Sequence, residues 1–102
     1  MNITVVLSRD ENIQHYNATT ISIDIEEYVK GVVGSEIGNA SIETCKAQAV
    51  AARTFAFIKH SNGKQLTDKS SSDQAFRISR ISSAYANALR AVEDTAGQVL
   101  YY

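Results

Sequence analysis

A run of small and apolar residues between positions 47 and 58 constrains the fold of this chain more than any other feature. Only Gln48, Arg53 and Thr54 interrupt it. The pattern predicts a helix over about 43–60, capped by Ser41, and a helix that is apolar on every side is buried. Five alanines allow close approach by its neighbours: Ala47, Ala49, Ala51, Ala52 and Ala56. We expect the helix to be buried in the single domain, residues 1–102, that a chain of 102 residues suits.

A second helix is predicted just before it. Asp24 is a good N-cap, and Glu27 three residues later completes a capping-box pattern. The apolar positions follow the spacing of one helical face, and they are Ile25, Tyr28, Val29, Val32 and Val33. Gly38-Asn39 is a plausible C-terminal stop.

The remaining elements complete an α+β fold. Residues 2–8 and 19–25 alternate in the manner of strands and predict an N-terminal hairpin-like pair, with a turn at Asp10-Glu11-Asn12. Residues 61–73 are polar and loop-like, and a third main helix is expected over about 83–95. Residues 98–102 predict a C-terminal strand whose apolar edge pairs with further sequence or with a second copy, which makes an oligomer through this strand an expectation.

Composition excludes several classes of function. The net charge is −1 with no basic block, so nucleic acid is not an expected partner. Cys45 is the single cysteine, which excludes an intrachain disulfide and predicts a buried thiol. No stretch approaches the roughly 20 apolar residues of a membrane span, and residues 1–4 lack a signal-peptide pattern. His15 and His60 are expected at the surface.

Glu36 has three interpretations. It continues the apolar face of the second helix, at i+3 from Val33 and i+4 from Val32. Burial and the negative end of the helix dipole would both keep a carboxyl group protonated to higher pH, as a general acid requires. Alternatively the helix frays near Gly34 and Glu36 points into water, or Glu36 forms a buried ion pair with Arg53.

The polar residues of the 43–60 helix also have two interpretations. Gln48, Arg53 and Thr54 line a polar cleft and bind sugar hydroxyls, or Gln48 and Thr54 satisfy local backbone groups. Asp68 and Asp73 are expected to cap turns, with cation binding as the alternative. No Gly-rich phosphate loop, HExxH or CxxC pattern is present.

Four segments resemble the stage II sporulation protein D family, which includes the amidase-enhancer proteins. Residues 25–36 (IEEYVKGVVGSE) resemble its "LEEYVKGVVxxEM" segment, and residues 43–56 (ETCKAQAVAARTFA) resemble "EALKAQAVAARTYA". Residues 72–77 (SDQAFR) resemble "xDQVYRG", and residues 91–100 (AVEDTAGQVL) resemble "AVxxTxGQVL". The four motifs follow the family's order over nearly the whole chain.

The resemblance implies a lytic transglycosylase that acts on bacterial peptidoglycan glycan strands, with Glu36 as the catalytic acid and base. Gln48, Arg53 and Thr54 are then expected to bind or support the glycan. A shortened relative that binds peptidoglycan, or assists a cell-wall amidase, without cleaving is the alternative. The resemblance also implies a site at the cell envelope, outside the cytoplasm.

The chain departs from the family pattern at specific places. Glu36-Ile37-Gly38 stands where the family has "EMP". Some members carry a zinc-binding cysteine pair near the third motif, where this chain offers Asp68 and Asp73, so no metal and no other cofactor is expected. The family domain continues past "GQVL" into further strands, so these residues are expected to encode an incomplete family domain.

Overall fold

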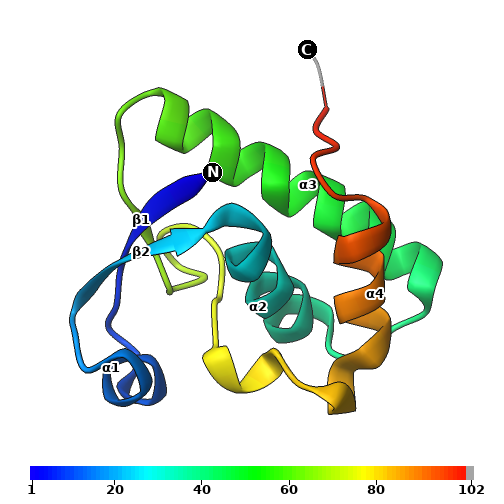
Figure 1. The fold of residues 1–102 in the computed structure, drawn as a ribbon, viewed down its shortest axis with the longest axis horizontal. Helices are drawn as coiled ribbons and strands as arrows, with labels where there is room; N and C mark the ends of the chain where they lie inside the picture. Colours follow the sequence, from blue (N-terminus) through cyan, green and yellow to red (C-terminus); the bar gives the residue numbers. More distant parts are fainter. Residues whose placement is uncertain (101–102) are drawn as a thin grey trace.

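The computed structural model of the protein describes residues 1–100 and has the α+β architecture that the sequence predicts (Figure 1). A small sheet of β1 (Asn2–Val6), β2 (Thr20–Asp24) and β3 (Leu66–Thr67) lies beside the helices. The three predicted main helices are α2 (Ile25–Ile37), α3 (Ile42–Ser61) and α4 (Ala86–Asp94), and each packs against the other two. Two 3-10 turns, η1 (Ile78–Arg80) and η2 (Ser83–Tyr85), lead into α4. The predicted start of this helix at 83 is therefore a 3-10 turn.

The sheet has the order β2-β1-β3. β1 and β2 are antiparallel, with Ile3 opposite Ile23 and Val5 opposite Ile21, which confirms the predicted hairpin-like pair. The strand β3 was missed within the predicted loop 61–73, and it pairs in parallel with β1, with Val5 opposite Leu66. Because side chains alternate along a strand, this register directs Ile3 and Val5 into the core.

A helix, α1 (Asp10–Tyr16), occupies the place where a turn was predicted between β1 and β2. Its polar residues bind a segment more than 60 positions away. Asn12 is fully buried; its Nδ2 donates to the Phe76 carbonyl at 2.7 Å and its Oδ1 accepts from the Ile78 N–H at 2.9 Å. Glu11 forms an ion pair with Arg77 at 3.1 Å. The turn prediction was wrong because these long-range bonds stabilise the helix.

Both predicted N-caps are present. The Asp24 side chain accepts from the Glu26 N–H at 3.0 Å, and the Ser41 hydroxyl accepts from the Thr44 N–H at 3.3 Å. Glu27, the expected partner in a capping box, instead binds Lys30 at 3.2 Å. α2 and α3 therefore begin where the sequence indicates, with one capping bond each from these side chains.

α3 is buried on one face only, which corrects the expectation of burial on every side. Cys45, Ala49, Ala52 and Ala56 face the other helices and are fully buried. α3 runs along the margin of the fold (Figure 1). Its opposite face exposes apolar side chains to solvent. These exposed residues are Ala47, Ala51, Phe55, Phe57 and Ile58. Within residues 1–100 no element packs over this face, so small apolar residues there do not report burial.

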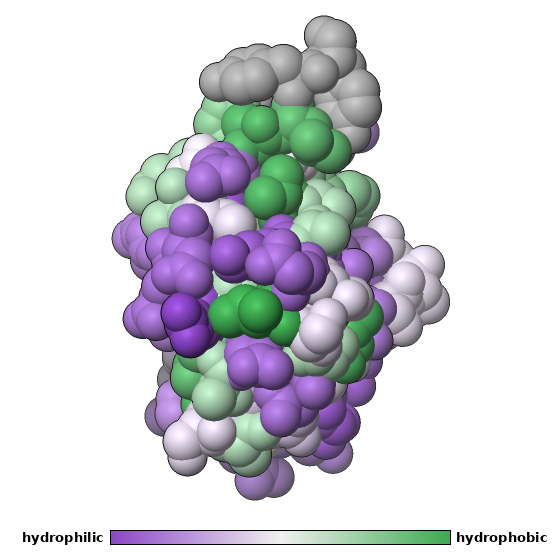
Figure 2. All heavy atoms as spheres, turned by 90° about the vertical axis from the view of Figure 1, so that its right-hand side faces the viewer, coloured by the Kyte–Doolittle hydropathy of each residue, from purple (hydrophilic) through white to green (hydrophobic). Residues whose placement is uncertain are grey.

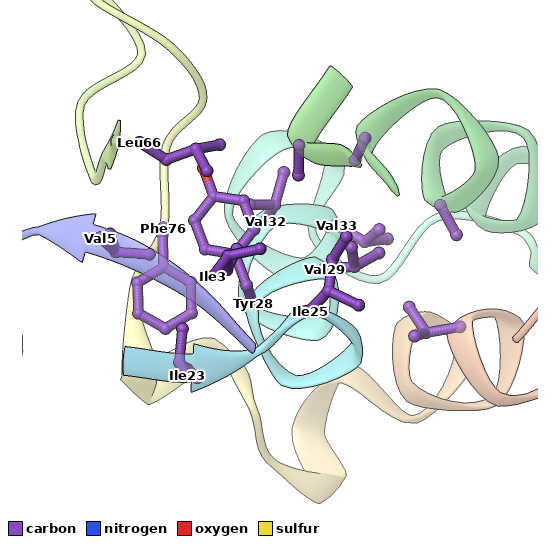
Figure 3. Packing of buried hydrophobic residues seen from close by; sticks show 14 of the residues in the cluster. Ile3, Val5, Ile23, Ile25, Tyr28, Val29, Val32, Val33, Leu66 and Phe76 are labelled. Atoms are coloured by element: carbon purple, nitrogen blue, oxygen red, sulfur yellow. The ribbon is translucent and has the colours of Figure 1, made fainter. Parts of the chain in front are cut away.

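The core surrounds α2, with side chains of the sheet and the Phe76 segment on one side and of α3 and α4 on the other (Figure 3). Tyr28 of α2 stacks on Phe76, with ring centroids 5.3 Å apart. Gly31 lies one turn further along α2, and a β-carbon there would come within 2.4 Å of the Phe76 ring. The absence of a side chain at Gly31 therefore lets the segment around Phe76 lie directly on α2.

The predicted strand at 98–102 does not form over residues 98–100; Tyr101 and Tyr102 lie outside the described residues. The Gln98 carbonyl accepts from Arg53 and the Leu100 N–H donates to Thr54, each at 2.9 Å, so this backbone binds side chains of α3 instead of a strand. Figure 2 shows several hydrophobic residues gathered in the upper part of one side of the molecule, and Leu100 is 49% exposed. Among the described residues, none of the helices has the length and apolar character needed to cross a membrane.

Candidate functional site around Glu36

Glu36 lies in the last turn of α2 with its side chain exposed to solvent. Burial along the apolar face ends at Gly34, although the helix continues to Ile37. The expectation that Glu36 is buried was therefore wrong, because the core ends one turn before the helix does. The alternative that Glu36 reaches water is confirmed, but without the predicted fraying of the helix.

The Glu36 carboxylate is held from one side by the backbone. Its Oε1 accepts from the Ala75 N–H at 2.8 Å. Within the part of the chain that the structure describes, no hydrogen bond engages Oε2. One carboxylate oxygen is thus fixed and the other is free to meet a ligand.

The segment that carries Ala75 is fixed at several points. Asp73 accepts from the Thr67 N–H at 2.8 Å and from the Thr67 hydroxyl at 2.9 Å, and it forms an ion pair with Lys59. Gln74 Nε2 donates to the Ala52 carbonyl of α3 at 3.4 Å. These bonds set the position of the N–H that binds Glu36. Sequence reasoning noted this stretch as a motif but assigned none of its residues to the site.

Tyr28 contributes a neutral hydroxyl near the same segment. Its O–H donates to the Thr67 carbonyl at 3.3 Å. Burial raises the pKa of this phenol well above its usual range, and the nearby carboxylates of Asp73, Asp68 and Glu36 act in the same direction. Tyr28 therefore stays protonated and acts as a hydrogen-bond donor at any physiological pH.

Arg53 does not pair with Glu36. The Arg53 guanidinium is 2% exposed and binds Glu26, with 2.7 Å between Nη2 and Oε1, and it donates to the carbonyls of Val92 and Gln98. Glu26 and Glu36 are ten residues apart on α2, about 15 Å along the axis at the usual helical rise. The prediction of an ion pair between Arg53 and Glu36 was wrong. The carboxylate that Arg53 meets is that of Glu26, in the first turn of α2.

The other two predicted glycan-binding residues differ in how they are bonded. The Thr54 hydroxyl donates to the Val50 carbonyl at 2.7 Å and accepts from Leu100, so the interpretation that it satisfies backbone groups is confirmed. Gln48 is half-buried on α3, one turn before the Ala52 carbonyl that Gln74 binds. Of the three, Gln48 alone retains a side chain without an assigned bond among residues 1–100.

Asp68 serves the scaffold. Its carboxylate accepts from the Arg9 N–H at 2.9 Å, the Ser8 hydroxyl at 2.7 Å and Asn12 Nδ2 at 3.0 Å. Burial by itself raises the pKa of Asp68, but these hydrogen bonds outweigh it and hold the pKa below its ordinary value. Asp68 and Asp73 thus stabilise the loop around β3, which agrees with the predicted turn-capping role.

The remaining candidates lie where the sequence places them. His15 and His60 are exposed, and Cys45 is fully buried, with its thiol donating to the Ala40 carbonyl at 3.6 Å. Among residues 1–100, no three His, Cys, Asp or Glu side chains gather closely enough to hold a metal ion.

The comparisons with known proteins bear on this geometry. No curated protein matches the chain. A family model described as SpoIID, stage II sporulation protein, matches residues 10–102, which include Glu36 and every element from α1 onward. The chain therefore belongs to the SpoIID family of stage II sporulation proteins, which links it to sporulation and to a role in the cell wall.

Proposed function

We propose that this protein cleaves peptidoglycan glycan strands as a lytic transglycosylase, with Glu36 as the general acid and base. The observation that carries the proposal is the exposure and hydrogen bonding of the Glu36 carboxyl group. It is exposed to a polymeric substrate, its Oε1 is oriented by the Ala75 N–H, and its Oε2 is free within the described residues. The proposal also places the protein at the cell envelope, outside the cytoplasm.

The reaction needs one carboxyl group used twice. Protonated Glu36 gives its proton to the glycosidic oxygen as the bond from that oxygen to the anomeric carbon breaks. The 6-hydroxyl of the same muramic-acid residue then attacks the anomeric carbon and returns its proton to the Glu36 carboxylate. One glycosidic bond is exchanged for a 1,6-anhydro bond, no water is consumed, and Glu36 ends in its starting state.

Product analysis on glycan strands freed of stem peptides tests the proposal. Wild type should yield 1,6-anhydro ends by mass spectrometry, and Glu36→Gln should reduce the rate by about 10²–10⁴-fold, the usual value of general acid–base catalysis. Glu43→Gln is the matched control, because Glu43 is exposed on α3 and pairs only with Lys46 among the described residues. Product formed equally by Glu36→Gln would overturn the assignment of the acid.

A second candidate function is binding without cleavage, with assistance to a cell-wall amidase as its outcome. The bonds of Arg53 to Glu26 and of Thr54 to Leu100 favour this candidate, because two of the residues predicted to bind the glycan are already engaged within the fold. Wild-type protein that binds glycan strands but forms no anhydro product would support it. An amidase assay with and without the protein would then measure the assistance directly.

A further inference from the structure

A pocket of about 390 Å³ opens where the C-terminal end of α3 meets the loop before Phe76. We call it the Phe55 pocket. It combines an apolar wall with basic, amide and hydroxyl groups, and its lining residues are Phe55, Ile58, Lys59, Asn62, Lys64, Ser72 and Asp73. Its volume falls within the range of small-molecule sites, about 300–1,000 Å³.

The apolar wall consists of side chains that are unusually exposed for their type. Phe55 is 40% exposed and Ile58 is 44% exposed. A flat aromatic face at the surface presents a large contact area to the C–H face of a sugar ring and loses little side-chain freedom on binding. The wall therefore suits a saccharide better than a fully polar ligand.

The polar wall carries a net positive charge. Lys59 lies 5.9 Å from the centre of the Phe55 ring and is neutralised by Asp73, whose side chain is fully buried. Lys64 is exposed and has no ion-pair partner among residues 1–100. Lys64 therefore offers an ammonium group without an ion-pair partner in a pocket that also holds an aromatic ring, which matches a sugar that bears a carboxylate.

The pocket and the proposed acid are connected through one segment of the chain. Asp73 lines the pocket, and Ala75, two residues later, donates its N–H to Glu36. Two residues of extended chain span at most about 7 Å. One short segment, residues 73–75, therefore both lines the Phe55 pocket and supplies the N–H that orients Glu36.

We propose that the Phe55 pocket binds a carboxylate-bearing sugar of the glycan strand, with the ring stacked on Phe55 and the carboxylate near Lys64. In a strand freed of stem peptides, this carboxylate is the lactyl group of a muramic-acid residue. The proposal rests on the proposed function for the identity of the polymer. It adds a subsite that selects for the acidic sugar and sets which glycosidic bond meets Glu36.

The test measures binding in a Glu36→Gln background, where no cleavage interferes. Two ligands are titrated, namely glycan strands freed of stem peptides and N-acetylglucosamine oligomers, which lack the lactyl carboxylate. Adding Phe55→Ala should weaken both ligands roughly three- to tenfold. Adding Lys64→Gln should weaken only the carboxylated strand, and this loss should shrink as salt is raised.

Two matched controls guard against general effects. Phe57→Ala removes a phenylalanine of similar exposure, 42%, from the same helix outside the pocket, and Lys69→Gln removes an exposed lysine nearby. Circular dichroism of each variant establishes that it is folded. Binding by the Phe55 and Lys64 variants that equals binding by these controls would overturn the proposal.

The two proposals fail in distinguishable ways. If wild type forms no anhydro product but Phe55→Ala and Lys64→Gln lose binding as described, the subsite stands and the enzyme proposal fails. If wild type cleaves and both pocket variants bind as the controls do, the acid stands and the subsite proposal fails.

Discussion

Arg53 donates hydrogen bonds to Glu26 from two nitrogens. Nε lies 2.9 Å from Oε2, and Nη2 lies 2.7 Å from Oε1. The pair joins the middle of α3 to the first turn of α2, and the remaining guanidinium bonds reach the end of α4 and the segment after it. One buried side chain therefore connects all three main helices.

Replacing Arg53 should be the most destabilising single change at a polar position. Arg53→Ala leaves Glu26 without its partner and frees two carbonyls, so the free energy of unfolding should fall by about 3–5 kcal/mol. Urea denaturation measures this. Arg90→Ala is the control, because that side chain is 74% exposed and its loss should change stability by less than about 0.5 kcal/mol. Equal stability of the two variants would contradict the scaffold role.

Asp68 should make stability depend on acid pH. Since its pKa is lowered in the folded protein, its contribution is fully present above the unfolded value of about 3.9 and is lost as pH falls below it. Asp68→Asn should lower the free energy of unfolding by about 1–3 kcal/mol at pH 7. The new amide group would face the N–H donors of Arg9 and Asn12, which now bind a carboxylate. The difference in the free energy of unfolding between wild type and variant, measured by urea titration, should become smaller below about pH 4. A constant gap across this range would exclude the linkage.

Gly31→Ala should destabilise the protein, against the usual trend for a helix. Alanine in place of a helical glycine normally stabilises by about 1 kcal/mol, but here the new β-carbon would come within 2.4 Å of the Phe76 ring. Overpacking of this kind costs about 1–3 kcal/mol. Thermal melting measures the sign, and a double variant with Phe76→Leu should show less than the sum of the two single losses. A Gly31→Ala variant that is more stable than wild type would show that the Phe76 ring can move away from the new β-carbon at little cost.

Cys45 should react with thiol reagents only when the protein unfolds. Burial raises the pKa of this thiol, although its bond to the Ala40 carbonyl acts in the opposite direction. Labelling followed by mass spectrometry should be slow in buffer and fast in denaturing urea. Rapid labelling of the folded protein would mean that the start of α3 opens frequently.

Glu36→Gln should separate activity from stability. The side chain is exposed, so its replacement should change the free energy of unfolding by less than about 0.5 kcal/mol. Cleavage should nevertheless be lost, and the urea midpoint provides the measurement beside the product assay. A large loss of stability would indicate that the hydrogen bond from the Ala75 N–H to Glu36 mainly stabilises the fold.

Local signals in the sequence predicted α2 and α3 and their starts well. Asp24 and Ser41 are caps because their short side chains reach the first free N–H groups, which depends only on neighbouring residues. α1 and β3 were missed because both depend on distant partners. Asn12 gains its bonds from Phe76 and Ile78, and the two residues of β3 are too few to show a pattern.

The sequence predicted which residue is the candidate acid, Glu36, but not which groups surround it. Periodicity placed Glu36 on the apolar face of α2, yet it cannot show where the core stops along that face. The pair of Glu26 with Arg53 was not predicted, because the spacing of apolar residues does not show which carboxylate of α2 an arginine of α3 will meet. The Ala75 N–H carries no side-chain signal, so the group that orients the acid was invisible without coordinates.

The parallel pairing of β1 with β3 has a consequence for how the chain is made. Val5 leaves the ribosome about sixty residues before its partner Leu66. During this interval one edge of the first strand is unpaired, and contacts so distant in sequence slow folding because a long loop must close first. The nascent protein should therefore acquire its helices early and its complete sheet last, and the period before β3 emerges is the one in which a chaperone would protect it.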